Sequence, residues 1–408
     1  MHHWGVRWGA LAACSLLGMT ACGDECQRLQ TCDIRDRDCQ RAILDWVGCV
    51  RGGDASLPQI RIGSEQDYLD RTRAEAPDDE ELAEQAAWNR GLARFKLAPA
   101  IYDRDEQQRD FAAEIGAVYF SDDKDILVID RGDPLSDDSA VAGLVHELVH
   151  AQQDVEHRLT ELRKRLGKTF DAGLALRGLT EGEAVLYQSL ALVELAGYAP
   201  GDVDWEKWFS DWRSEQLEDA DADETPYLMS YVRFPYAFGG GFVAQAWLER
   251  GREAVDALYA RPPLQTRSLL FPTPQLELAD TVREVRAHCR PTLAEGFEVQ
   301  GFATLGSWLA YMYQRRVKPG AQDPWFLAQH LAADCFAVQR HESGQLAASW
   351  HVSMLASTSG NAWPGADELS FVRRSISGSG HDAFLIGTEL VVPPDPGAIE
   401  WGEIEADE

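Results

Sequence analysis

The sequence predicts an α+β protein, and three observations support this class. Runs of β-branched and aromatic residues at 116–120 and 126–129 flank a polar turn, which predicts a β-hairpin. Stretches with few helix breakers at 139–165 and 174–196 predict long helices. Beyond Pro291, short apolar runs again alternate with polar turns, which predicts a smaller α+β unit at the C-terminal end.

Composition and charge narrow the class of protein. The chain has 408 residues, of which 45% are hydrophobic and 26% are charged, an ordinary globular balance. This length predicts two or three domains with real cores. The 67 acidic residues exceed the 38 basic ones, so the net charge is −29. Because such a chain repels phosphate backbones, we expect no nucleic-acid partner.

The first residues predict export from the cytosol. A single cation at Arg7, an apolar stretch from Trp8 to Ala21 and small residues at its end are typical of a signal peptide over residues 1–21. Cys22 after this small-residue pair resembles the lipobox of bacterial lipoproteins, which implies a lipid anchor at Cys22 in the cell envelope. Gly23 favours the outer membrane. A plain secretory signal, with Cys22 paired to another thiol, is the alternative.

A cysteine-rich segment is expected over residues 22–56. Its polar composition provides few apolar residues for a core, so disulfides are expected to hold it. Three pairings are possible for four of its cysteines, and their spacing does not match a zinc knuckle. These four are Cys26, Cys32, Cys39 and Cys49. Cys289 and Cys335 remain as a further pair.

The main domain is expected over residues 57–288. It begins with an alternating strand at 59–62, and charged amphipathic helices follow within 65–94. The hairpin then leads into the helix at 139–165, for which Ser136 or Asp138 is the expected cap.

The second half of this domain is expected to be helical. An amphipathic helix at 205–217 precedes an acidic run at 218–224, interpreted as a solvated loop because it lacks the spaced ligands of a calcium loop. A glycine-rich turn around 239–241 leads into a helix at 242–252. A smaller α+β domain at 289–395 is expected to hold a helix at 305–317 and strands near 336–339 and 347–350, before an acidic tail at 396–408.

The strongest chemical signal is His146-Glu147-Leu148-Val149-His150. On a helix the two histidines lie one turn apart on the same face, so both rings can reach one metal ion. Glu147 lies beside them, where a carboxylate can take a proton from water. This is the HExxH pattern of zinc metallopeptidases, and its apolar flanks favour a metal site over a surface helix.

A catalytic zinc ion needs a third protein ligand. His157 is one residue too far away for the HExxHxxGxxH pattern, and Gln153 stands where that pattern has glycine. Glu181 and Glu183 are the remaining candidates. Thr180 and Glu183 have the spacing of a capping box, which would leave Glu181 free to bind the metal. The Glu-Gly-x-Ala frame also resembles the third-ligand motif of gluzincins, so Glu181 is preferred and Glu183 stays open.

Several motifs together resemble a group of largely uncharacterised bacterial lipoproteins that are similar to gluzincin-type metallopeptidases. They lie at 116–120, 126–129, 146–154, 179–184 and 234–239, within a likeness that runs from about residue 58 to 263 and, more loosely, to the end of the chain. The resemblance implies a zincin-like catalytic domain. It departs at Phe271-Pro272, where such proteins often have His-Pro, and we assign no ligand there.

The resemblance also implies roles for residues around the metal. The strand Ile126–Ile129 would be the edge along which a peptide lies. Tyr236 would stabilise the oxyanion, although it alternates with Phe234 and Phe238 and so can equally belong to a core. Asp154, one turn after His150, can accept the second ring proton of that histidine or simply face solvent.

These observations lead to a functional prediction. We expect a zinc metalloendopeptidase at the bacterial cell envelope that acts on a peptide or protein substrate, with His146, His150 and Glu181 as Zn²⁺ ligands and with Glu147 and Tyr236 as catalytic residues. The alternative is a lipoprotein that binds partners on a zincin frame without turnover. A zinc amidase acting on the cell wall is a third possibility that nothing in the sequence favours. The other histidines are expected to be structural or surface residues; they are His288, His330, His341, His351 and His381.

Overall fold

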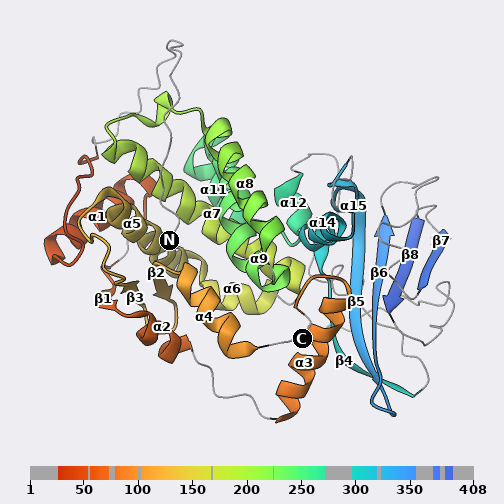
Figure 1. Cartoon of the computed structure of the whole chain (residues 1–408). Helices are drawn as coiled ribbons and strands as arrows, with labels where there is room; N and C mark the ends of the chain where they lie inside the picture. Colours follow the sequence, from red (N-terminus) through yellow and green to blue (C-terminus); the bar gives the residue numbers. More distant parts are fainter. Residues whose placement is uncertain are drawn as a thin grey trace.

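The computed structural model describes ten stretches of the chain: residues 26–53, 56–72, 79–99, 103–166, 169–223, 225–271, 296–318, 323–354, 371–376 and 382–388. Their architecture is mixed α+β, as predicted. A body of helices carries a small sheet on one side and joins a larger sheet at one end (Figure 1). The signal segment, Cys22, Cys289, His288, His381 and the acidic tail lie outside the described residues. Among the described helices, none is long and apolar enough to cross a membrane.

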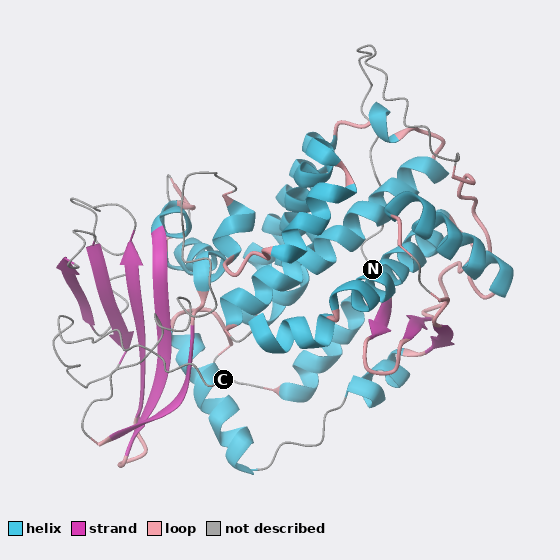
Figure 2. Cartoon of the chain, turned by 180° about the vertical axis from the view of Figure 1, so that it is seen from behind, coloured by secondary structure: helices cyan, strands magenta, loops and turns pink. Residues whose placement is uncertain are grey.

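The helices of the body lie between the two sheets (Figure 2). The α-helices are α1 (Arg37–Arg51), α2 (Glu65–Thr72), α3 (Asp79–Arg94), α4 (Arg104–Glu114), α5 (Asp138–His157), α6 (Leu159–Leu166), α7 (Phe170–Leu195), α8 (Trp205–Ala222), α9 (Pro226–Phe234), α10 (Gly240–Arg250), α11 (Arg252–Ala260), α12 (Thr266–Leu270), α14 (Gly306–Val317) and α15 (Phe326–His330). A short 3-10 helix, η1, spans Pro200–Asp202, and a π-helical turn, η2, spans Pro235–Gly239. The strands are β1 (Gln59–Gly63), β2 (Ala117–Phe120), β3 (Asp125–Ile129), β4 (Phe297–Ala303), β5 (Leu331–His341), β6 (Leu346–Met354), β7 (Phe371–Ile376) and β8 (Asp382–Thr388).

The small sheet confirms the hairpin and corrects its edge. Strands β2 and β3 pair antiparallel, but β1 pairs parallel with β3, so the order is β1-β3-β2. The strand Ile126–Ile129 is therefore central, and the edge strand next to α5 is β2. The reason is burial on both faces: Ile126 and Val128 pack in the main core, whereas Leu127 and Ile129 face α2 and α4. An unbroken apolar run is typical of such a central strand.

The N-terminal segment joins the main core. Its disulfides are Cys26–Cys49 and Cys32–Cys39, one of the three pairings left open by the sequence. They indicate an oxidising, extracytoplasmic compartment. The apolar residues of the segment do not stand alone, because they pack against the same core as α5 and α7; these are Leu29, Ile34, Ile43, Leu44, Trp46 and Val47. Cys335 is disulfide-bonded, and its expected partner Cys289 lies outside the described residues.

Helix α5 differs from the prediction at both ends. Its cap is Asp137, whose carboxylate accepts from the Ala140 N–H at 2.8 Å, rather than Ser136 or Asp138. The predicted single helix breaks at Arg158, which adopts a left-handed backbone with φ 51°. The chain turns there and continues as α6. Since a left-handed arginine carries no sequence signature, the break was not predictable.

Helix α7 begins four residues before the predicted start, at Phe170, and Thr169 caps it by accepting from the Ala172 N–H at 3.2 Å. Thr180 and Glu183 consequently lie inside a helix of 26 residues. The predicted capping box is wrong, because these backbone N–H groups already bond within the helix.

The acidic run is helical rather than a loop. Helix α8 extends to Ala222, and its last turn pairs with arginines from other helices. Asp219 and Asp223 lie 3.5 and 3.3 Å from Arg233 of α9, and Asp221 pairs with Arg315 of α14. These ion pairs tie three helices together.

The C-terminal hairpin and helix are confirmed as β5–β6 and α14. The sheet has the order β4-β5-β6-β8-β7 and is antiparallel throughout. Apolar side chains from both sides of the expected boundary at residue 288 form one cluster. Phe95 just after α3, Phe234 of α9, Trp308 of α14 and Trp350 of β6 are all fully buried in it. The C-terminal unit therefore shares its core with the helical body.

Two glycines allow the backbones of α7 and η2 to touch. A Cβ on Gly182 would lie 2.3 Å from the Gly239 carbonyl carbon, and one on Gly239 would lie 2.0 Å from the Gly178 carbonyl oxygen. No side chain fits between them. Pro235, which has no N–H to give to the preceding turn, accompanies the π-helical widening at η2. The expected glycine-rich turn is thus a continuous helical segment.

We expect Gly182→Ala to lower the free energy of unfolding by about 1–3 kcal/mol, because the new methyl group meets backbone that cannot move aside. Gly143→Ala in α5 is the matched control, since a Cβ there meets nothing within 4 Å. This control should be neutral or slightly stabilising. Thermal unfolding of both variants is the measurement, and equal melting temperatures would contradict the close-packing argument.

A buried acid at the junction with the C-terminal unit provides a pH-dependent prediction. Asp171 accepts from the Thr266 N–H at 2.9 Å and from its hydroxyl at 2.5 Å. Burial, with Asp334 nearby, raises the pKa of Asp171 to about 7. In the unfolded chain this pKa is about 3.9. The folded state therefore binds this proton more tightly, and stability falls as pH rises from about 4 to about 7.

The variant Asp171→Asn cannot ionise, so its melting temperature should fall less over this pH range than that of the wild type. The exposed Asp211→Asn is the control. Melting temperatures at half-unit pH steps are the measurement, and parallel curves for Asp171→Asn and wild type would overturn the assignment.

Candidate metal centre

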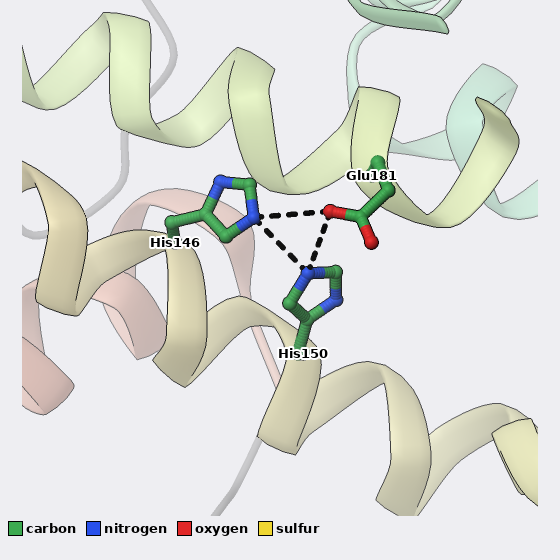
Figure 3. Close-up of side chains that lie close together, drawn as sticks. All are labelled: His146, His150 and Glu181. Atoms are coloured by element: carbon green, nitrogen blue, oxygen red, sulfur yellow. Dashed lines mark hydrogen bonds and ion pairs between the residues drawn. The ribbon is translucent and has the colours of Figure 1, made fainter. Parts of the chain in front are cut away.

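Three buried side chains from α5 and α7 converge on one point (Figure 3). The Nε2 atoms of His146 and His150 lie 3.1 Å apart, and each lies 3.2 Å from Oε2 of Glu181. All three residues are no more than 8% exposed. The histidines project from successive turns of α5 as predicted, and Glu181 faces them from the middle of α7.

This triangle has the size that a zinc ion requires. A tetrahedral ion with bonds of about 2.0 Å to its ligands separates neighbouring ligand atoms by about 3.3 Å. The three distances in the protein are 3.1–3.2 Å. Two imidazoles and one carboxylate also match a donor set of catalytic zinc sites. The group can hold a metal ion without rearrangement.

Hydrogen bonds behind the histidines place their protons away from the triangle. The Nε2 group of Gln153 donates to the Thr180 carbonyl at 2.8 Å and to Glu183 at 2.9 Å. Its Oε1 atom must then face Nδ1 of His150, at 2.9 Å, which therefore carries the proton. Gln188 Oε1 lies 3.1 Å from Nδ1 of His146 in the same way. In neutral rings of this tautomer both Nε2 atoms direct a lone pair into the triangle, as metal ligands require.

The charges around Glu181 favour its ionised form. Burial opposes ionisation, but the Arg177 guanidinium holds the pKa of Glu181 well below its usual range. Arg177 lies one helical turn earlier on α7, with Nη2 3.2 Å from Glu181 Oε1. An ionised carboxylate is what a metal ligand must be.

Glu183 does not join this group. Its carboxylate lies 2.8 Å from Nε of Arg51 and also accepts from Tyr259 and Gln153. Between the two candidates left open by the sequence, the structure brings Glu181 to the histidines. The preference for Glu181 agrees with this placement, although the capping argument behind it fails.

Glu147 lies beside the triangle. Within the described residues, no lysine or arginine is paired with its carboxylate. Its Oε2 accepts the backbone N–H of Tyr119, on edge strand β2, at 2.7 Å. Burial raises the pKa of Glu147 to about 7 against the opposing effect of His146. A carboxylate held in this way can accept and return a proton near neutral pH.

Tyr236 lies against His146. Its ring stacks on that of His146, with centroids 5.9 Å apart and planes at 16°. Burial, with the Glu181 carboxylate nearby, raises the pKa of the Tyr236 hydroxyl, so the phenol stays protonated. Phe234 and Phe238 stack on each other in the other core, because in a helix residues four apart share a face. Tyr236 thus packs apart from Phe234 and Phe238, although it lies between them in the sequence.

Four residues near the metal group were missed by sequence reasoning: Tyr119, Gln153, Arg177 and Gln188. The sequence spacing could have revealed two of them. Arg177 precedes Glu181 by one helical turn, and Gln153 follows His150 by about one turn, so in each pair the side chains share a helix face. Asp154 was expected to support His150, but it accepts from Tyr119 OH at 3.0 Å, from Leu159 N at 3.1 Å and from Lys124. Gln153 takes the role instead, because Asp154 faces the hairpin.

The other described histidines lie outside the metal group. His157 stacks on Tyr259, with ring centroids 3.8 Å apart, and is not part of the metal group. His330 bonds to the carbonyl of Phe326 and His341 to Ser343, each within its own turn. His351 lies in β6.

Comparisons of the chain with family models, with curated proteins and with solved structures give no match. The function is therefore argued from the site itself.

We expect Gln153→Leu to weaken zinc binding about 10- to 100-fold, because His150 loses the acceptor that keeps its proton on Nδ1. The zinc dissociation constant, measured by competition with a chromophoric chelator, tests this. Gln245→Leu on the exposed side of α10 is the control. Unchanged zinc affinity in Gln153→Leu would show that Gln153 does not orient the ligand.

Proposed function

We propose that the protein is a zinc-dependent peptide hydrolase with a zincin-like arrangement, acting at the cell envelope. The observation that carries the proposal is the triangle of three electron-pair donors, from His146, His150 and Glu181, with Glu147 directly beside it. The hairpin, the motif helix and the second ligand-bearing helix occur in the order of the gluzincin resemblance. The disulfides support a site of action outside the cytosol.

Each group has a distinct chemical task in this proposal. When bound, zinc supplies a Lewis acid that polarises the scissile carbonyl and makes water more acidic. Glu147 takes the proton of the attacking water and delivers it to the leaving amine. The Tyr119 N–H keeps the Glu147 carboxylate in place. The protonated Tyr236 hydroxyl, on a ring that stacks against His146, donates to the developing oxyanion.

The edge of the small sheet supports a peptide as the substrate. Strand β2 contacts α5 and is unpaired on the side away from β3 in the described residues. An extended peptide can add to such an edge through main-chain hydrogen bonds. The edge strand assigned from the resemblance is replaced by β2 in this proposal.

Metal analysis of the full chain tests the proposal. We expect about one zinc per chain in wild type and in Glu147→Gln, and none in Glu181→Ala. The control is Glu253→Ala, whose side chain is 80% exposed and remote from the triangle. Absence of zinc from the wild type, after zinc is supplied and excess removed, would overturn the metal site.

Hydrolysis of a broad peptide library separates an enzyme from a zincin-like binding protein. Glu147→Gln should retain zinc but lose about 10²–10⁴ in rate, because its amide cannot accept the water proton. Equal rates in wild type and Glu147→Gln, or no turnover by the zinc-loaded wild type, would favour the binding protein.

A further inference from the structure

A chain of buried hydrogen bonds runs from the N-terminal segment to the metal group. Nε of Arg51, the last residue of α1, donates to Glu183 Oε1 at 2.8 Å. Glu183 Oε2 accepts from Gln153 Nε2 at 2.9 Å, and Gln153 Oε1 faces His150 Nδ1 at 2.9 Å. Three helices, α1, α7 and α5, are thereby linked to one ring nitrogen.

Burial makes this chain sensitive to each of its members. Arg51 and Glu183 are each only 1% exposed, so neither charge is solvated; Arg51 also pairs with Glu156 at 2.9 Å, whereas Glu183 depends on Arg51. Removing one member of a buried pair leaves the other charge uncompensated. Glu183 has no second cationic partner among its hydrogen bonds in the described residues, since Tyr259 and Gln153 are neutral donors.

Glu183 decides which way the Gln153 amide points. Two acceptors, the Thr180 carbonyl and Glu183, hold the Nε2 group and so direct Oε1 to His150. If Glu183 moves away, one of these acceptors is lost and the amide can turn. An Nε2 group facing Nδ1 of His150 would favour a proton on the opposite nitrogen, where it blocks the metal.

The position of Arg51 depends in turn on the disulfide-bonded segment. Cys49, two residues earlier, is bonded to Cys26, which ties the last turn of α1 to the start of the described chain. Two further bonds to α7 hold the same segment, from Leu29 N and Trp46 Nε1 to Glu194 at 2.6 and 3.1 Å. The Arg51 carbonyl accepts from Arg252 of α11 at 2.9 Å. Cys32–Cys39 lies at the other end of α1.

We propose that Arg51 is a positioning residue of the metal centre and that the Cys26–Cys49 disulfide sets it in place. Metal affinity then depends on oxidation of this one cysteine pair, so that the centre is completed only after the chain reaches an oxidising compartment. The inference rests on the proposed function in one respect, the binding of a metal ion by His146, His150 and Glu181.

Zinc affinity of the full chain, measured by chelator competition well below the melting temperature, tests the inference. We expect Arg51→Met and the double variant Cys26→Ser/Cys49→Ser to bind zinc about 10- to 100-fold more weakly than wild type. The matched control is Cys32→Ser/Cys39→Ser, which removes the shorter loop, with a separation of 7 residues rather than 23. It should lower the melting temperature but keep zinc affinity within about twofold of wild type.

The tautomer of His150 is a second readout that a purely structural role would leave unchanged. In zinc-free wild type, the ring ¹⁵N resonances should report a proton on Nδ1. In Arg51→Met they should report a mixture of the two tautomers. If Arg51→Met fails to fold, Arg51→Lys, which keeps the charge beside Glu183 but loses the bonds to Gln152 and Glu156, takes its place and should show a smaller shift in the same direction.

The outcomes separate this inference from the proposed function. Tight zinc binding by wild type with unchanged affinity in the Arg51 variants would overturn the inference alone. Equal weakening in both disulfide variants would also overturn it, because that result indicates general loosening of the segment. A wild-type chain that binds no zinc would overturn the metal centre and, with it, this inference.

Discussion

The centre of this protein depends on holding three electron-pair donors against their mutual repulsion. Two imidazole nitrogens and a carboxylate oxygen lie within 3.1–3.2 Å of one another, and the hydrogen bonds behind the rings keep protons out of the space between them. Such an arrangement persists only where the surrounding structure fixes each donor from behind. Gln153 and Gln188 do this for the histidines, and Arg177 does it for Glu181. A metal cation bound in the proposed site would attract all three donors, and the supporting residues hold the donors in position for it.

Helix packing brings the supporting residues to the same place. Gly182 of α7 and Gly239 of η2 let these two segments approach backbone to backbone, and Tyr236 of η2 lies beside His146. The π-helical turn at Pro235 directs Tyr236 to one core while Phe234 and Phe238 fill the other. Gly182 thus contributes to the site by allowing close helix packing, since glycine has no functional group of its own.

The disulfide-bonded N-terminal segment contacts residues behind the metal group. Its helix packs on α5 within the main core, and its final residue reaches Glu183 behind the metal group. Glu183 follows Glu181 by two residues and so faces away from the histidines, toward α1 and α11. Two neighbouring carboxylates on one helix therefore face different partners, Glu181 the two histidines and Glu183 the buried arginine.

The sequence by itself determined the α+β class, the hairpin, the motif helix and the pair of histidines, because these depend on short-range periodicity and residue type. It also reduced the candidate third ligand to Glu181 or Glu183. Tertiary structure brings Glu181 to the histidines and Glu183 to Arg51, which lies far from Glu183 in the sequence. The parallel pairing of β1 with β3, the disulfide connectivity and the partner of His150 were decided in the same way. Each joins residues whose proximity exists only after the helices pack, and no local pattern records it.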